Sequence, residues 1–67
     1  MKINDAVKVN EKVYSSLSDI EQLLIDLNLK HNHIYEVEDI ALSDKGEVIF
    51  LKELTNIGFD SIWFKKL

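Results

Sequence analysis

The sequence predicts a mainly β domain of four to five strands with one α-helix inserted after the first strand. Short segments of alternating apolar and polar residues lie on both sides of a single stretch with helical periodicity. The chain has 67 residues, which is enough for one small domain, so we expect a single domain over residues 1–67. Hydrophobic residues make up 46% of it and charged residues 30%, a composition typical of a chain that folds.

The first strand is expected within residues 5–14. Val7 and Val9 alternate with polar residues, and the alternation resumes at Val13 after a break near Asn10. Alternation of this kind is typical of a half-buried strand, here interrupted once.

The helix is predicted at about residues 18–28. Ser18 followed three residues later by Glu21 fits a capping box, in which each residue binds a free backbone amide of the other. Apolar residues then recur at the spacing i, i+3, i+4, i+7, which places them on one helical face. They are Ile20, Leu23, Leu24 and Leu27. A helix of about three turns does not persist alone, so we expect this face to dock on the strands and cover one end of the fold.

A hairpin is predicted from two further strands, at residues 33–41 and 47–54. The turn between them lies at residues 43–46, where Gly46 would supply a positive φ angle. In the first of these strands the alternation breaks near Asp39, which predicts a β-bulge.

The end of the chain is expected to contain a turn at residues 55–58 and a final apolar segment at 59–67. Within that segment, Ile62, Trp63 and Phe64 are consecutive, and side chains alternate across a strand, so the three cannot all point inward. Either Ile62 or Trp63 is then exposed, and an exposed Trp is a typical interface anchor.

Three segments of the C-terminal half resemble small SH3-like barrel proteins encoded by bacteriophages and prophages. They match a Tyr-x-Val-x-x-Ile strand, a strand ending in Leu-x-Glu-Leu, and a Gly-Phe-x-x-x-x-Phe tail, at residues 34–40, 46–54 and 58–67. The resemblance implies a small SH3-like barrel of four to five strands. It also implies a 3₁₀ turn over residues 60–62 before the last strand, with Phe59 and Phe64 inside the barrel.

Charge is distributed unevenly along the chain. The net charge is −4, but residues 19–60 contain ten acidic and three basic residues, a net charge of −7. Such a segment repels phosphate backbones and anionic lipid and attracts a basic surface. The same composition also serves as a solvated face that keeps a small protein soluble. We expect no direct nucleic-acid contact and no membrane contact.

No motif for catalysis or for a cofactor is present. The absence of cysteine excludes disulfides, Cys-ligated zinc and thiol chemistry, and together with the absence of an apolar leader it favours a cytoplasmic protein. His31 and His33 lie at the expected helix-to-strand turn, where polar residues are common, so we expect no metal and little change in stability when both are replaced. The two glycines are isolated and form no phosphate-binding loop. The sequence therefore indicates that the chain is not an enzyme.

The main functional hypothesis is a phage or prophage accessory protein that binds and modulates or inhibits a host protein in the bacterial cytoplasm. The host protein would have a basic surface, and in a sharper form of the hypothesis the chain mimics the charge of a nucleic acid. Glu36, Glu38 and Asp39 would form an acidic strip, and Trp63 would be the apolar anchor. The alternative is a structural or assembly protein that forms a homo-oligomer through the Trp63 edge. A third hypothesis is an adaptor for peptides or nucleic acids, and the missing basic patch counts against nucleic acid.

Overall fold

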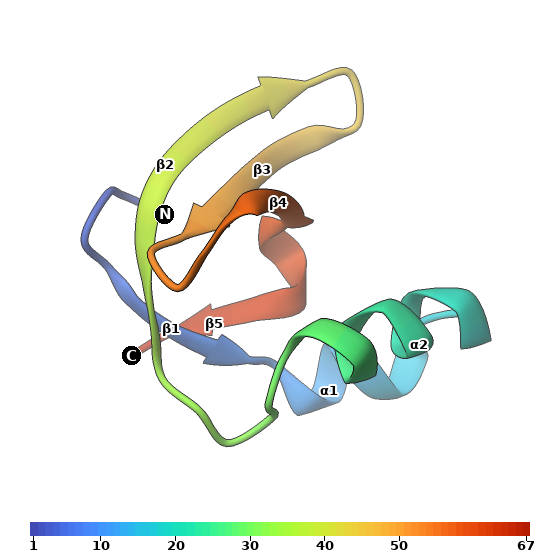
Figure 1. Ribbon diagram of the computed structural model, residues 1–67. Helices are drawn as coiled ribbons and strands as arrows, with labels where there is room; N and C mark the ends of the chain where they lie inside the picture. The colour runs from blue at the N-terminus through green and yellow to red at the C-terminus, as the bar shows by residue number, and fades with distance from the viewer.

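A computed structural model describes all 67 residues as a five-stranded antiparallel sheet with two α-helices (Figure 1). The mainly β prediction is confirmed, although two helices rather than one follow the first strand. The elements in chain order are β1 (Ala6–Val9), α1 (Glu11–Ser16), α2 (Asp19–Asn28), β2 (Tyr35–Ser43), β3 (Gly46–Leu51), β4 (Leu54–Asp60), the 3₁₀ turn η1 (Ser61–Trp63) and β5 (Phe64–Lys66).

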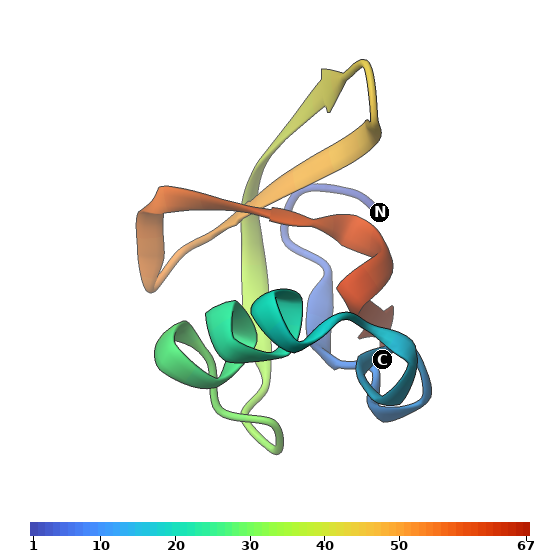
Figure 2. The same cartoon turned by 90° about the vertical axis from the view of Figure 1, so that its right-hand side faces the viewer.

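The sheet has the strand order β4-β3-β2-β1-β5, and each neighbouring pair is antiparallel. The first strand therefore lies between β2 and the last strand. The turn η1 connects β4 to β5, one residue later than the SH3-like resemblance implies. Figures 1 and 2 both show the tip of the β2–β3 hairpin at one end of the molecule and the two helices at the other.

The β2–β3 hairpin follows the sequence prediction closely. Gly46 has a φ angle of 125°, which is the positive value expected at the end of the turn. The register shifts between Val37 and Asp39, where the bulge was predicted. Asp39 Oδ1 accepts a hydrogen bond of 2.8 Å from the backbone N–H of Ile40 and so holds the irregular backbone in place.

Residues 11–16 form a helix rather than the second part of a strand. The side-chain oxygen of Asn10 accepts hydrogen bonds from the backbone N–H groups of Lys12 (3.1 Å) and Val13 (3.4 Å). An Asn at the N-cap satisfies amides that have no partner within the helix, which favours a helix at this point. This local cap overrides the alternation of Val9 and Val13.

β4 passes through residues 55–58, where the sequence predicts a turn. The turn lies earlier, at residues 52–53. Gly58 pairs with Phe50 across the ladder, and a Cβ on Gly58 would lie 2.7 Å from Val48 Cγ1 and 3.2 Å from the Phe50 ring. Glycine therefore serves here to admit two large cross-strand side chains, not to reverse the chain.

The core consists of eleven buried residues, all of them apolar or aromatic. Phe59 and Phe64 pack edge to face inside it, with ring centroids 5.9 Å apart, as the resemblance implies. Helix α2 contributes one residue to the core, and a second follows directly after the helix. The eleven are Val7, Val9, Ile25, Leu29, Tyr35, Val37, Ile49, Leu51, Phe59, Trp63 and Phe64. Neither helix has the length and apolar character needed to cross a membrane.

Candidate functional site

The apolar stripe of helix α2 faces solvent. Ile20 and Leu27 are each 73% exposed, Leu23 is 56% exposed and Leu24 is 46% exposed. These four residues, called the α2 stripe below, were predicted to dock on the sheet, and that prediction is wrong. Contiguous exposed apolar residues are uncommon on monomeric proteins, and they mark surfaces that contact another molecule.

The opposite face of α2 docks instead. Ile25 is completely buried and Leu29, at the C-cap, is almost so. About one turn before Ile25, the side-chain amide of Gln22 donates a 2.8 Å hydrogen bond to the backbone oxygen of Tyr14 in α1. Successive helical residues are about 100° apart, so this face lies on the other side of the helix from the α2 stripe. The helix thus docks through the face with fewer apolar side chains.

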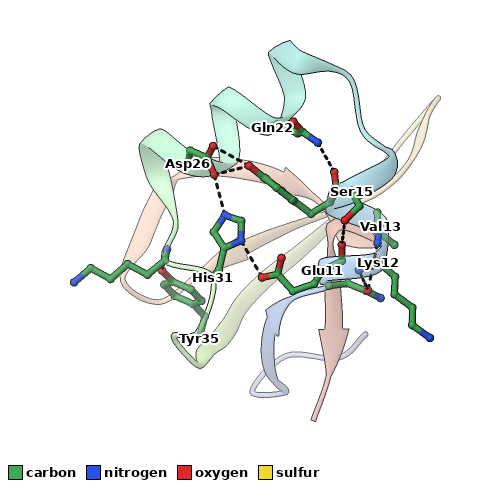
Figure 3. A network of polar contacts seen from close by, with 11 residues as sticks. Glu11, Lys12, Val13, Ser15, Gln22, Asp26, His31 and Tyr35 are labelled. Carbon is green, nitrogen blue, oxygen red and sulfur yellow. Dashed lines mark hydrogen bonds and ion pairs between the residues drawn. The ribbon is translucent and has the colours of Figure 1, made fainter.

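A network of polar side chains holds α2 in this orientation (Figure 3). The Tyr14 hydroxyl donates to the Asp26 carboxylate, 2.8 Å from Oδ2 and 3.0 Å from Oδ1. His31 lies between two carboxylates, with Nε2 2.8 Å from Asp26 Oδ1 and Nδ1 2.9 Å from Glu11 Oε1. The rings of Tyr14 and His31 meet edge to face at 4.4 Å. The network joins α1, α2 and the segment after α2.

The charges of this network reinforce one another. A carboxylate only accepts hydrogen bonds, so both contacts of His31 are complete when both ring nitrogens carry a proton. The hydrogen bond to Asp26, followed by the one to Glu11, accordingly raises the pKa of His31. The hydrogen bonds from His31 and Tyr14 lower the pKa of Asp26, and the bond to Asp26 raises the pKa of Tyr14. His31 therefore has a structural role that its position in a turn did not suggest, and its replacement is no longer expected to be neutral.

The predicted acidic strip lies on the outer face of β2. Glu36, Glu38 and Asp39 are exposed, while Tyr35 and Val37 point inward, so the predicted alternation is confirmed. The three acids are not equally free, however. Glu36 Oε2 lies 3.0 Å from Lys52 Nζ, and Asp39 Oδ1 accepts a hydrogen bond from the backbone N–H of Ile40 at the bulge. Glu38 is the acid of this strip with neither an ion pair nor a side-chain hydrogen bond.

Trp63 does not lie on the surface, and the prediction of an exposed Trp63 anchor is wrong. It is 9% exposed and packs against Phe59 with ring centroids 6.4 Å apart, whereas Ile62 is 61% exposed. The strand alternation used to place these residues does not apply, because both belong to the 3₁₀ turn η1. The indole Nε1 of Trp63 is buried without a hydrogen-bond partner.

Two open cavities indent the surface, and neither has the apolar lining of a small-molecule site. The smaller has a volume of about 210 Å³ and is lined by Asn28, Lys30, His33, Tyr35, Glu53 and Leu54. The larger has a volume of about 420 Å³ and is lined by Lys8, Val9, Asn10, Glu11, Lys12 and Lys65. No group of three or more His, Asp or Glu side chains is arranged to hold a metal ion.

Comparison of the chain with protein-family models, with curated proteins and with solved structures finds no match. Among the surfaces described above, the α2 stripe is the one that sequence reasoning placed in the core. The spacing of Ile25 and Leu29 at i and i+4 was the available signal for a second, docking face. That signal comes from two apolar residues, whereas the α2 stripe contains four, so periodicity alone favours the stripe as the docking face.

Proposed function

We propose that this chain is a non-catalytic binding protein that engages a partner protein through the α2 stripe. The observation that carries this proposal is the exposure of four apolar side chains on the side of α2 opposite its docking face. Complete burial of such a side chain contributes about 1.5–3 kcal/mol, so covering these partly exposed ones contributes about 4–7 kcal/mol before the costs of association. An i, i+3, i+4, i+7 set of anchors is how a helix is recognised by a groove or by another helix.

The partner we propose is a host protein with a basic surface, bound by a phage or prophage accessory protein in the bacterial cytoplasm and modulated or inhibited by that contact. The net charge of −7 over residues 19–60 supports a basic partner, because complementary charge speeds encounter. Mimicry of nucleic acid by the strip on β2 has less support, since Lys52 neutralises Glu36.

A homo-oligomer is the second candidate, and the same surface favours it. In the sequence, this hypothesis depended on Trp63, which is buried. The α2 stripe supplies an exposed apolar surface through which two copies could associate instead. The two candidates differ in what covers the stripe, and a binding experiment separates them.

Affinity capture with matched variants tests this proposal. The tagged protein, a Leu23→Ser/Leu27→Ser variant and a Leu42→Ser control are each exposed to host lysate. Leu42 is 84% exposed at the end of β2, so its replacement removes a leucine outside the α2 stripe that is at least as accessible as Leu23 and Leu27. The wild type and the control should retain the same dominant protein, and the double variant should lose it while its circular dichroism spectrum stays unchanged. Retention by the double variant would overturn the proposal.

A further inference from the structure

The α2 stripe has the dimensions of a contact with one helix. It extends over eight residues from Ile20 to Leu27, a rise of about 10 Å or about two helical turns. Ile20, Leu23 and Leu27 have the spacing of successive a, d and a positions, at which paired helices interlock their side chains, and Leu24 occupies the adjoining e position. A narrow seam of this kind is covered along its length by the matching seam of a second helix.

Acidic residues flank this seam on both sides. Asp19 and Asp26 are seven residues apart and lie on one side of the stripe, whereas Glu21 lies on the other side, each about 90–110° from its middle. No basic residue occurs in α2, and the next one along the chain, Lys30, follows the helix. Asp26 is held in position by Tyr14 and His31, and its ion pair with His31 offsets its charge, so Asp19 and Glu21 contribute most of the negative charge beside the seam.

We propose that the partner contacts the α2 stripe through an amphipathic helix whose apolar seam is flanked by Lys or Arg side chains. This inference rests on the proposed function and names the chemistry of its partner. Residues that flank a helix–helix seam select the partner by charge, and the flanks of α2 select a basic one.

A second copy of the chain is the less suitable occupant of the stripe. If two α2 helices pair antiparallel, the flank of Asp19 and Asp26 faces the same flank of the other copy. If they pair in parallel, that flank faces the Leu24 edge of the other copy, and Glu21 lies beyond that edge. Acidic side chains meet acidic side chains in the antiparallel pair, and no basic residue of α2 lies opposite them in the parallel pair, which disfavours association.

Three synthetic peptides test this inference directly. Each is a helical peptide of about three heptads with the same leucine seam. The residues that flank the seam are all Lys in the first peptide, all Gln in the second and all Glu in the third. Fluorescence anisotropy of the labelled peptides measures their binding to the full chain. The Lys-flanked peptide should bind about tenfold more tightly than the Gln-flanked one, and the Glu-flanked peptide should bind most weakly. The preference should shrink as the salt concentration rises from about 0.05 M to about 0.5 M.

Variants of the chain test whether the acidic residues beside the α2 stripe cause the preference for Lys-flanked peptides. Leu23→Ser/Leu27→Ser should abolish binding of all three peptides. Asp19→Lys should reduce the preference for Lys over Gln flanks severalfold. Asp44→Lys changes an exposed acid in the β2–β3 turn, outside α2, by the same amount of charge and is the matched control, so it should leave the preference nearly unchanged.

Several outcomes would overturn the inference. Equal binding of the Lys- and Gln-flanked peptides, or an equal effect of Asp19→Lys and Asp44→Lys, would show that the flanks of α2 do not select the partner. A wild-type dimer in sedimentation equilibrium that the Leu23→Ser/Leu27→Ser variant abolishes would make a second copy the occupant. If lysate capture still depends on the stripe in these cases, the proposed function stands and this inference alone fails. If capture is independent of the stripe, both fail.

Discussion

Two isoleucines of the same helix provide a direct test of which face of α2 is docked. Ile25 is completely buried and Ile20 is 73% exposed, so Ile→Ala at each site deletes the same atoms from opposite environments. Loss of a fully buried isoleucine side chain lowers the free energy of unfolding by about 2–5 kcal/mol. Ile20→Ala should change it by no more than about 0.5 kcal/mol, because replacements on an exposed surface have small effects.

Leu24 adds an intermediate case beside Ile25 in the chain. It is 46% exposed, so Leu24→Ala removes about half as much buried surface as a core deletion and should cost less than about 1.5 kcal/mol. In thermal unfolding, 1 kcal/mol corresponds to about 4–8 °C for a domain of this size, so Ile25→Ala should lower Tm by at least about 8 °C.

Urea denaturation followed by the fluorescence of Trp63 measures the three variants on one scale, provided that the slope with urea is unchanged. If Ile25→Ala does not fold, Ile25→Val replaces it, with an expected loss of about 0.5–1.5 kcal/mol. Destabilisation by Ile20→Ala and Leu24→Ala as large as that by Ile25→Ala would show that the α2 stripe is part of the core and unable to bind a partner.

Four further predictions concern the rest of the fold. Because the pKa of His31 is raised in the folded state, the stabilising contribution of His31 should be complete below about pH 6.5 and lost as pH rises through the raised value. In urea unfolding measured as a function of pH, His31→Asn should remove this loss of stability, and the matched His33→Asn variant should retain it. Because the pKa of Asp26 is lowered, its contribution should disappear only as pH falls below the usual range of an Asp, and Asp26→Asn should abolish that part of the acid unfolding curve. Trp63→Phe should cost far less stability than the about 3–5 kcal/mol expected for Trp63→Ala, since Phe also removes the unpaired indole N–H; equal losses from the two would contradict this account. Gly58→Ala should lower Tm clearly, because its Cβ would overlap Val48; an unchanged Tm would show that the sheet adjusts at no cost.

The features that sequence rules predicted here are those set by neighbours along the chain. The capping box of Ser18 and Glu21, the positive φ of Gly46 and the bulge near Asp39 each depend on residues within a few positions, and all three are present. The burial of Tyr35 and Val37 and the exposure of Glu36 were likewise predictable, because a strand has only two faces and the apolar one packs inward.

The errors arose where distant parts of the chain decide between two locally acceptable arrangements. Periodicity shows that the residues of the α2 stripe share a face, but it contains no information on which face the strands cover. Ile25 occupies the core position, and a network of polar side chains from Glu11 to His31 holds the helix in the orientation that buries it. Trp63 was misplaced for a related reason, because a strand and a 3₁₀ turn direct the same residue to different sides.

The stripe of α2 and the core of the domain share no side chain, so selection can act on them separately. A change at Ile20, Leu23 or Leu27 alters the exposed surface of the helix and leaves the buried core of the sheet unaffected. Under the proposed function, the specificity of the helix can therefore change among descendants of this chain while the strands keep the fold. The same independence makes α2 a place where a new specificity can be introduced by engineering, with the five strands as an unaltered support.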